Sequence, residues 1–404
     1  MGKKICMIGA FDTKGKEFEF LYSEILRRGF EVLSINAGSI GTTSLFPVDV
    51  DADEVAVAGG GNIADIRSGE RAVATRIMCD GAQKLVDKLY REGQIAGIIG
   101  MGGGGGTAVA TLAMRNLPVG FPKVCVSTLA SGNTSEFVGR QDIVMFPSIV
   151  DICGVNRFLR QIISRAAGAV CGMAEVDPPV VEADRPIVFI SMFGSTTKCV
   201  EQCVALLDKA GYDSIVFHAT GSGGRTLEEL TLEGHPTAVL DITTTEWADE
   251  LAGGVFTAGP SRLDAPGTMG LPHLIVPGCV DMVNFFSPDS VPQKYKETKR
   301  QFVEWTPMIT LMRTNPDENR QIGEIFAKKA NNAGGPVKFL IPRGGVSVLD
   351  APGKPFYNPE ANAAFSKALR ENIAPGIEIT DIDAHINDQE FSQRAVELLL
   401  SMIK

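Results

Sequence analysis

Five consecutive glycines, residues 102–106, are the residues of this chain whose type and spacing most directly suggest chemistry. A run without side chains lets backbone N–H groups close around an anion. The run follows an apolar stretch, residues 95–99, and precedes a helical pattern that we expect to begin at Thr107. The first N–H groups of a helix have no intrahelical partner and carry the positive end of the helix dipole. The sequence therefore predicts a binding site for phosphate or carboxylate at this turn.

Two common phosphate-binding motifs do not match this run. Gly100, Gly102 and Gly105 have the spacing of a dinucleotide-binding loop, but no acidic residue ends a strand about 20 residues later. No lysine follows the glycines, as the P-loop motif requires. The alternative interpretation is a turn that allows a helix to pack closely on a strand.

Side chains that follow other predicted strands complete the site. Asp12 and Lys14 follow the apolar stretch 4–9, and small polar residues follow the stretch 123–126. Loops after parallel strands meet at one edge of a sheet, so we expect these groups near the glycines, where Lys14 would neutralise phosphate charge. The predicted ligand-binding residues are Asp12, Lys14, Gly102, Gly103, Gly104, Gly105, Gly106, Thr107, Ser131, Gly132, Asn133 and Thr134.

Alternating strand and helix patterns predict an α/β fold made of two Rossmann-like domains with mostly parallel sheets. Residues 187–220 align with residues 5–38 without a gap, which indicates an internal duplication. The segment 175–186 contains three prolines and four acidic residues, a composition typical of a linker. We therefore predict a first domain at residues 1–175, which binds the ligand, and a second domain at residues 186–404.

The second half lacks the five glycines but keeps polar residues at its predicted strand ends. Arg225 follows a Ser-Gly-Gly turn and could hold a second anion, and Arg343 follows a late apolar strand. His385 lies among acidic residues that alternate at the end of a predicted strand, so it could be a general base or a metal ligand. A solvated strand end is the alternative interpretation. With Asp12, these three residues are the candidates for catalysis, and no reaction is assigned.

Composition excludes several functions. A net charge of −10 and a pI near 5.1 argue against a nucleic-acid partner. No segment reaches the roughly 18 uninterrupted apolar residues of a membrane span, and the N-terminal apolar run is too short for a signal peptide. The eight cysteines contain no C-x-x-C pair and resemble reduced core residues, so we predict no protein metal site. We expect a cytoplasmic protein without a membrane partner.

Five segments together resemble a known family: GAFDTKGKEFEF, GMGGGGGTAVAT, STLASGNTSEFVG, HATGSGGRTLEEL and IPRGGVSVLDAPGKPF. Over nearly its full length the chain is similar to the uncharacterised family named for the tomato mosaic virus resistance protein, an ATP-binding domain family. This resemblance implies a two-domain α/β protein that binds ATP and forms a homodimer. It implies no reaction.

Two functions therefore stay open, and a third, a pure assembly or inhibitor role, would leave the number of polar strand ends unexplained. The first is a nucleotide-binding protein that holds ATP, with or without Mg²⁺, at residues 102–107 near a cleft between the domains. Asp12 is the nearby acidic residue that could bind Mg²⁺. The second is a metabolic enzyme whose small phosphorylated or carboxylated substrate lies in that cleft, with Arg225, Arg343 and His385 facing the glycines. An apolar slot for adenine beside the glycines would favour the first function.

Overall fold

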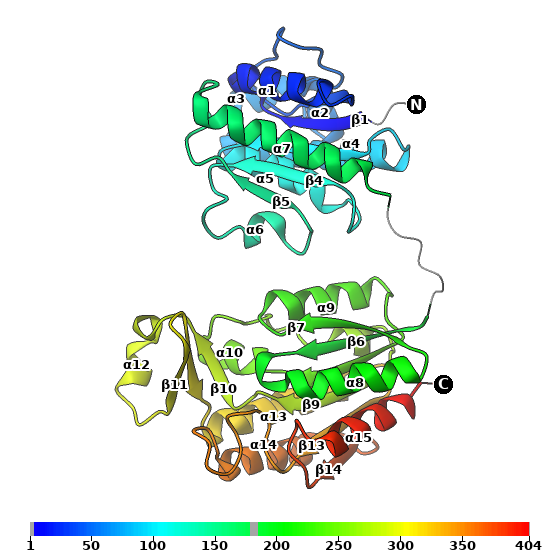
Figure 1. Cartoon of the computed structure of the whole chain (residues 1–404), viewed down its shortest axis with the longest axis vertical. Helices are drawn as coiled ribbons and strands as arrows, with labels where there is room; N and C mark the ends of the chain where they lie inside the picture. Colours follow the sequence, from blue (N-terminus) through cyan, green and yellow to red (C-terminus); the bar gives the residue numbers. More distant parts are fainter. Residues whose placement is uncertain (1–3, 178–184, 404) are drawn as a thin grey trace. The chain divides into compact units, whose positions relative to one another are not determined.

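The computed structural model describes residues 4–177 and 185–403 of the 404-residue chain. The chain divides into two compact units, Met1–Val180 and Val181–Lys404, and each unit has its own sheet and its own core (Figure 1). Residues 178–184 of the predicted linker lie outside the described residues. The arrangement of helices around two mostly parallel sheets confirms the predicted α/β fold of Rossmann-like type.

The first unit contains a five-stranded parallel sheet in the order β2-β1-β3-β4-β5. Its strands are β1 (Lys4–Gly9), β2 (Glu31–Asn36), β3 (Gly97–Gly102), β4 (Lys123–Ser127) and β5 (Val144–Pro147). The central strands are apolar throughout because helices cover both faces of a parallel sheet. Ile5 and Met7 of β1 belong to the core on one face, and Cys6 and Ile8 belong to the core on the other.

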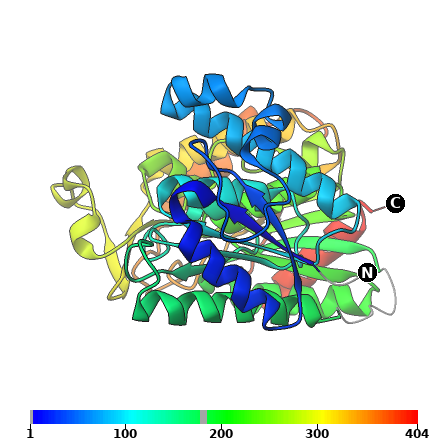
Figure 2. The ribbon, with the colours of Figure 1, turned by 90° about the horizontal axis from the view of Figure 1, so that it is seen from above.

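Helices form a layer on each face of this sheet. They are α1 (Phe11–Leu26), α2 (Ala52–Ala58), α3 (Ile63–Ser68), α4 (Arg71–Arg91), α5 (Gly104–Arg115), α6 (Ser135–Val138) and α7 (Arg157–Glu175). Figure 2 shows α1 and α7 together on one face of the sheet and α4 on the opposite face. Leu21 of α1 and Ile163 of α7 pack in one core, whereas Ala82 of α4 and Ala110 of α5 pack in the other.

The helix after the glycines starts earlier than the sequence predicted. It begins at Gly104 instead of Thr107, so residues 104–106 form its first turn. The preceding strand extends over Gly97–Gly102, where the apolar pattern had predicted residues 95–99. Glycine has the lowest helix propensity after proline, and the pattern therefore placed these residues in a loop.

The second unit contains a six-stranded parallel sheet in the order β14-β13-β9-β8-β6-β7. Its strands are β6 (Ile187–Met192), β7 (Asp213–His218), β8 (Ala238–Thr243), β9 (His273–Gly278), β13 (Val337–Pro342) and β14 (Glu378–Ile382). A separate antiparallel sheet has the order β10-β12-β11. Its strands are β10 (Met282–Phe285), β11 (Phe302–Thr306) and β12 (Ile309–Arg313).

The helices of the second unit also form two layers. They are η1 (Gly194–Thr196), α8 (Thr197–Lys209), α9 (Ser222–Leu232), α10 (Glu246–Ala252), α11 (Ala265–Thr268), η2 (Pro288–Ser290), α12 (Gln293–Lys296), α13 (Pro316–Asn331), α14 (Pro359–Asn372) and α15 (Gln389–Leu400). Cys203 of α8 and Ala395 of α15 share the core on one face of the sheet. Ile322 of α13 and Phe365 of α14 share the core on the other face.

The two units repeat one topology. Their parallel sheets share the order of the first five strands, because β7-β6-β8-β9-β13 follows the same path as β2-β1-β3-β4-β5. Aligning Ile5 with Ile187 places Glu31 on Asp213 and Asn36 on His218, and these are the bounds of β2 and β7. The gapless sequence repeat therefore corresponds to the same strands in both units.

Candidate functional site

The strand order of the first unit creates a topological switch point. From β1 the chain passes to β2 on one side, and it then returns to β3 on the other side of β1. The loops that follow β1 and β3 therefore diverge, and parallel sheets of this order bind ligands in the crevice between two such loops. Ile8 of β1 pairs with Gly100 of β3, so the two loops leave the sheet side by side.

A cavity of about 740 Å³ occupies this switch point. Its volume lies within the range of roughly 300–1,000 Å³ that is typical of small-molecule sites. Asp12 and Lys14 line it from the first turn of α1, which follows β1, and residues 37–40 line it from the loop after β2. All five glycines, residues 102–106, line it from the end of β3 and the start of α5.

Packing requires glycine at some positions of this segment and not at others. A Cβ on Gly100 would overlap a side chain of α5, and a Cβ on Gly102 would lie 2.7 Å from the α5 backbone. Close packing of the helix on the strand therefore requires these two glycines. A Cβ on Gly104 would meet no atom closer than 3.9 Å, and a Cβ on Gly105 none within 4 Å. Neither residue is among the described glycines with positive φ, so packing and backbone angles leave both unexplained.

The first turn of α5 presents free backbone donors at the cavity. Thr107 N–H donates to the carbonyl oxygen of Gly103 at 2.8 Å, which is the first bond of the helix. The N–H groups of residues 104–106 precede that bond and have no helical acceptor, nor any other in the described chain. The hydroxyl of Thr107 is buried under the turn, 2.7 Å from Ser127 Oγ. Thr107 therefore supports the turn and is not among the described residues that line the cavity.

Asp12 organises the loop after β2. Its Oδ2 accepts the N–H groups of Ile40 at 2.8 Å and Gly41 at 3.2 Å. A side chain on Gly38 would overlap the carboxylate, so this loop lies directly against it. Its Oδ1 is buried and has no partner among the described residues. Asp12 thus holds one wall of the cavity in place.

Two cationic residues also line the cavity. Lys14 Nζ donates to the carbonyl oxygen of Ile152 at 2.5 Å, and Arg67 Nε donates to the carbonyl oxygen of Ser39 at 2.9 Å. Each side chain keeps further N–H donors, because ammonium has three and guanidinium has five. With Asp12 as the acidic residue among those that line the cavity, the lining carries a formal charge of +1.

The cavity also has an apolar wall, which the sequence did not indicate. Ile66 of α3, Ala74 and Met78 of α4, and Val109 of α5 are all buried and all line it. These residues are separated in sequence, and they come together because α4 and α5 pack on the same face of the sheet. The apolar wall and the position of Arg67 at the cavity could have been predicted only from the strand order, and not from the spacing of residues along the chain.

The structure places four predicted ligand-binding residues elsewhere. Ser131, Gly132, Asn133 and Thr134 are not among the described residues that line the cavity. They follow β4, which lies beyond β3 from the switch point. Asn133 Oδ1 accepts the N–H of Ser135, so this polar segment forms the turn that starts α6.

Side chains fill the equivalent place in the second unit. The turn between β8 and α10 consists of threonines, residues 243–245, which are fully buried. Thr243 Oγ1 lies 2.7 Å from Thr196 Oγ1, and Thr244 Oγ1 donates to the carbonyl oxygen of Val276 at 3.0 Å. The duplicated turn has therefore become part of the core in one unit and part of a cavity wall in the other.

The glycine turn at the start of α9 binds a carboxylate of the protein itself. Glu246 Oε1 accepts the N–H groups of Gly221 at 2.9 Å and Gly224 at 3.1 Å. Arg225, which the sequence suggested for a second anion, donates to the carbonyl oxygen of Thr257 at 2.9 Å. A carboxylate of the same unit thus takes the position that the sequence suggested for an anionic ligand.

A buried ionic cluster joins the elements around Glu246. Arg262 Nε donates to Glu246 Oε2 at 2.7 Å, its Nη1 donates to Glu228 Oε1 at 3.0 Å, and its Nη2 pairs with Asp241. His273 Nε2 lies 2.7 Å from Asp241 Oδ2. Burial acts to raise the pKa of Asp241, but Arg262 and His273 outweigh it and hold this pKa below its usual range. The cluster fixes α9, α10 and β8 to one another.

The other two catalytic candidates also have partners within the second unit. Asp383 to Asn387 lie beyond the end of β14, so the predicted alternation along a strand is wrong there. His385 Nε2 lies 2.9 Å from the carbonyl oxygen of Ser347, and its Nδ1 accepts the N–H of Asn387 at 3.1 Å. Both ring nitrogens therefore serve the fold. Arg343 donates to Asp381 Oδ2 at 3.0 Å.

The fold and the cavity define a protein of two Rossmann-like α/β units with a glycine-lined crevice in the first. Family models match both units: the N-terminal domain of the uncharacterised protein family UPF0261 matches residues 3–179, and its C-terminal domain matches residues 185–403. The chain belongs to the UPF0261 family.

Relatives of similar length are found in bacteria, and a longer one in a plant. A UPF0261 protein of Clostridium tetani is 43% identical over 100% of both chains. A UPF0261 protein of Mesorhizobium japonicum is 41% identical over 98% of both chains. The tomato mosaic virus resistance protein Tm-1 of Solanum lycopersicum is 35% identical over 99% of this chain, which spans 56% of the tomato protein.

Two further features of the described residues concern membrane and metal binding. Within residues 4–177 and 185–403, no helix has the length and the apolar character that crossing a membrane demands. Within the same ranges, no three His, Cys, Asp or Glu side chains form a group that could hold a metal ion.

Proposed function

We propose that the first unit binds a phosphorylated nucleotide, ATP in the first place, with its phosphates at the N-terminal turn of α5. The observation that carries this proposal is the pair Gly104 and Gly105, where neither packing nor backbone angle demands glycine. A ligand that lies against the backbone supplies the missing reason, because a side chain would keep it from the N–H groups.

Charge in the cavity agrees with a phosphate group. Residues 104–106 direct three free N–H groups from the positive end of a twelve-residue helix. Lys14 and Arg67 add two cations at the same cavity, against the one carboxylate of Asp12. Mg²⁺ bound with ATP would be held chiefly by phosphate oxygens and water, as is usual for this ion, and would neutralise phosphate charge.

The apolar wall favours a nucleotide over a simple phosphate. Ile66, Met78 and Val109 offer a surface on which a flat base could lie, at the same cavity as the glycines. Inorganic phosphate or a small sugar phosphate would leave that wall in contact with water. Arg225 and His385 bond within the second unit, so two of the groups that the alternative of a metabolic enzyme assigned to its substrate serve the fold instead.

A thermal-shift panel on the full chain tests the proposal. We expect ATP to stabilise the protein more than adenosine or tripolyphosphate alone, because only ATP reaches both the glycine turn and the apolar wall. At 100 times its dissociation constant a ligand adds about 2.7 kcal/mol to the unfolding free energy. The Gly104→Val variant should fold normally and lose this shift, since a Cβ at this position meets no atom closer than 3.9 Å. Equal shifts in the variant and the wild type would contradict the proposal.

A further inference from the structure

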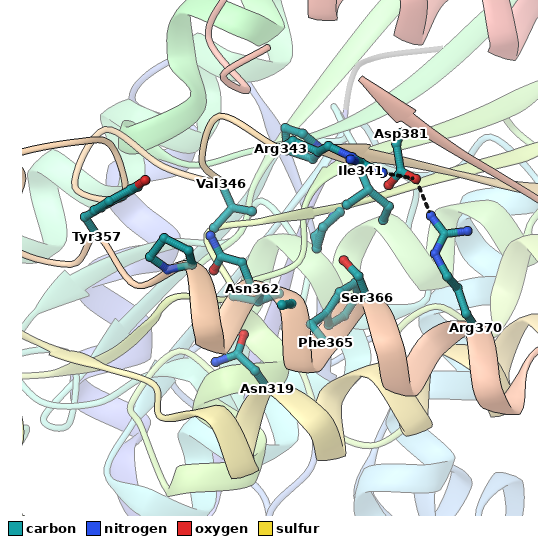
Figure 3. A pocket seen from close by; sticks show the side chains of 15 residues that line it. Asn319, Ile341, Arg343, Val346, Tyr357, Asn362, Phe365, Ser366, Arg370 and Asp381 are labelled. Carbon is teal, nitrogen blue, oxygen red and sulfur yellow. Dashed lines mark hydrogen bonds and ion pairs between the residues drawn. The ribbon is translucent and has the colours of Figure 1, made fainter. Parts of the chain in front are cut away.

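A second cavity, of about 340 Å³, lies in the second unit beside α14 (Figure 3). Pro342 at the end of β13 and Asp381 near the end of β14 both line it. The carboxyl ends of parallel strands are where such sheets bind ligands. All of its lining residues belong to the second unit, so it is separate from the glycine cavity.

One end of this cavity is cationic. Arg343 and Arg370 donate to the same oxygen, Oδ2 of Asp381, at 3.0 Å and 2.6 Å. Figure 3 shows the two guanidinium groups on either side of this carboxylate. Both arginine side chains are exposed, that of Arg343 by 60% and that of Arg370 by 42%, and each keeps N–H groups that Asp381 does not use. Asp383 lies 3.9 Å from Arg343 but is 91% exposed, so water screens its charge.

The rest of the cavity is apolar with a few hydroxyl groups. Ile341, Val346 and Phe365 form its walls. Ser366 lies one helical turn before Arg370 on α14, and Tyr357 lies at the other end of the cavity in Figure 3. Within the described chain, neither hydroxyl has a hydrogen-bond partner.

Buried polar bonds hold the floor of the cavity in place. Asn362 Nδ2 donates to Asp350 Oδ2 at 2.6 Å, and its Oδ1 accepts from Arg313 at 3.0 Å. Asn319 is fully buried and donates to Thr314 Oγ1 at 2.8 Å. Its own Oδ1 has no partner in the described chain, and unsatisfied buried acceptors of this kind are uncommon in folded proteins.

We propose that this cavity binds a small carboxylic acid with an apolar carbon skeleton. Arg343, Arg370 and Asp381 are the charged residues of its lining and sum to a formal charge of +1, which suits one monoanionic carboxylate better than a dianionic phosphate. The carboxylate lies on the two guanidinium groups beside Ser366. The carbon skeleton lies on Ile341 and Val346, and a polar group at its far end meets the phenol of Tyr357.

Calorimetric titrations of the full chain with three ring compounds test this site. The probes are 4-hydroxybenzoate, its neutral amide 4-hydroxybenzamide, and phenyl phosphate, with hexanoate as a carboxylate that has no ring. We expect 4-hydroxybenzoate to bind most tightly, and the Arg370→Gln variant to bind it at least about tenfold more weakly, equivalent to about 1.4 kcal/mol. Lys367→Gln is the matched control, because Lys367 lies on the same helix, pairs with Glu371 and does not line the cavity.

Each other outcome would overturn the proposal. Equal affinities for the acid and the amide would show that the guanidinium groups do not select the ligand. Tighter binding of phenyl phosphate would identify a phosphate site instead. If neither 4-hydroxybenzoate nor hexanoate bound, carboxylates with a ring and carboxylates with an open chain would both be excluded as ligands. Equal losses in Arg370→Gln and Lys367→Gln would trace the effect to the general charge of α14.

Discussion

Replacing Gly105 by alanine should stabilise the first unit and weaken nucleotide binding at the same time. A Cβ at this position meets no atom within 4 Å, and the residue lies in the first turn of α5. Alanine is about 0.5–1 kcal/mol better than glycine inside a helix, so we expect a gain of up to about 1 kcal/mol. For a unit of this size such a gain raises the melting temperature by about 2–4 °C.

The loss of affinity follows from the contacts that the new methyl group displaces. A hydrogen bond to a charged group contributes about 1.5–3 kcal/mol, and 1.4 kcal/mol is a factor of ten in affinity. Displacing a phosphate from one backbone N–H should therefore weaken ATP binding about 10-fold to 100-fold. Calorimetry on the variant and the wild type measures this change directly.

A matched control separates helix propensity from ligand contact. Gly172 of α7 is exposed, also meets no atom within 4 Å, and does not line the cavity. Gly172→Ala should raise the melting temperature in the same way and leave ATP affinity unchanged. A folded Gly105→Val variant that binds ATP as tightly as the wild type would refute the reasoning, since its larger side chain could not avoid a ligand on this turn.

Three further outcomes follow from the structure. Gly100→Ala should lower the melting temperature, because its Cβ would overlap α5. An unchanged melting temperature would show that β3 and α5 can move apart without a loss of stability. Arg262→Met should cost about 3–5 kcal/mol of unfolding free energy, measured by urea denaturation, because three buried carboxylates lose their cation; a loss below about 1 kcal/mol would contradict this. Burial, together with Asp350, raises the pKa of Asp281 to about 7, so the folded state holds this proton between about pH 4 and 7 while the unfolded state releases it. The contribution of Asp281 to stability should therefore fall as pH rises through that window, by at most about 1.4 kcal/mol per pH unit, and melting curves of Asp281→Asn should show a smaller fall than the wild type; Asp249, whose pKa burial also raises to about 7, keeps the remainder.

Much of the fold follows from sequence pattern alone. Continuous apolar strands alternating with amphipathic helices require a parallel sheet covered on both faces, and the aligned repeat from Ile5 and Ile187 predicted the same elements in both halves. Strand order does not follow from such patterns, because any order that keeps the crossovers right-handed satisfies them. The switch point between β1 and β3, and with it the position of the cavity, could therefore be located only in the structure.

The site itself was predictable only in part. Glycines without side chains indicated an anion, but the sequence could not tell that Gly100 and Gly102 serve packing while Gly104 and Gly105 meet empty space. Residues 131–134 resemble a phosphate loop in composition, yet they do not line the cavity, and Asn133 accepts the N–H of Ser135 in the turn that starts α6. Polar residues at strand ends in the second unit bond within that unit, as Glu246 does to the backbone N–H of Gly221. A linear sequence pattern cannot show such internal partners.

The most direct test of the central claim is a crystal structure of the protein with ATP. We expect phosphate oxygens within about 3 Å of the N–H groups of residues 104–106, which is hydrogen-bonding distance, and the base against Met78 and Val109. Nucleotide bound elsewhere in the chain, with the first turn of α5 left to solvent at saturating ATP, would contradict the account.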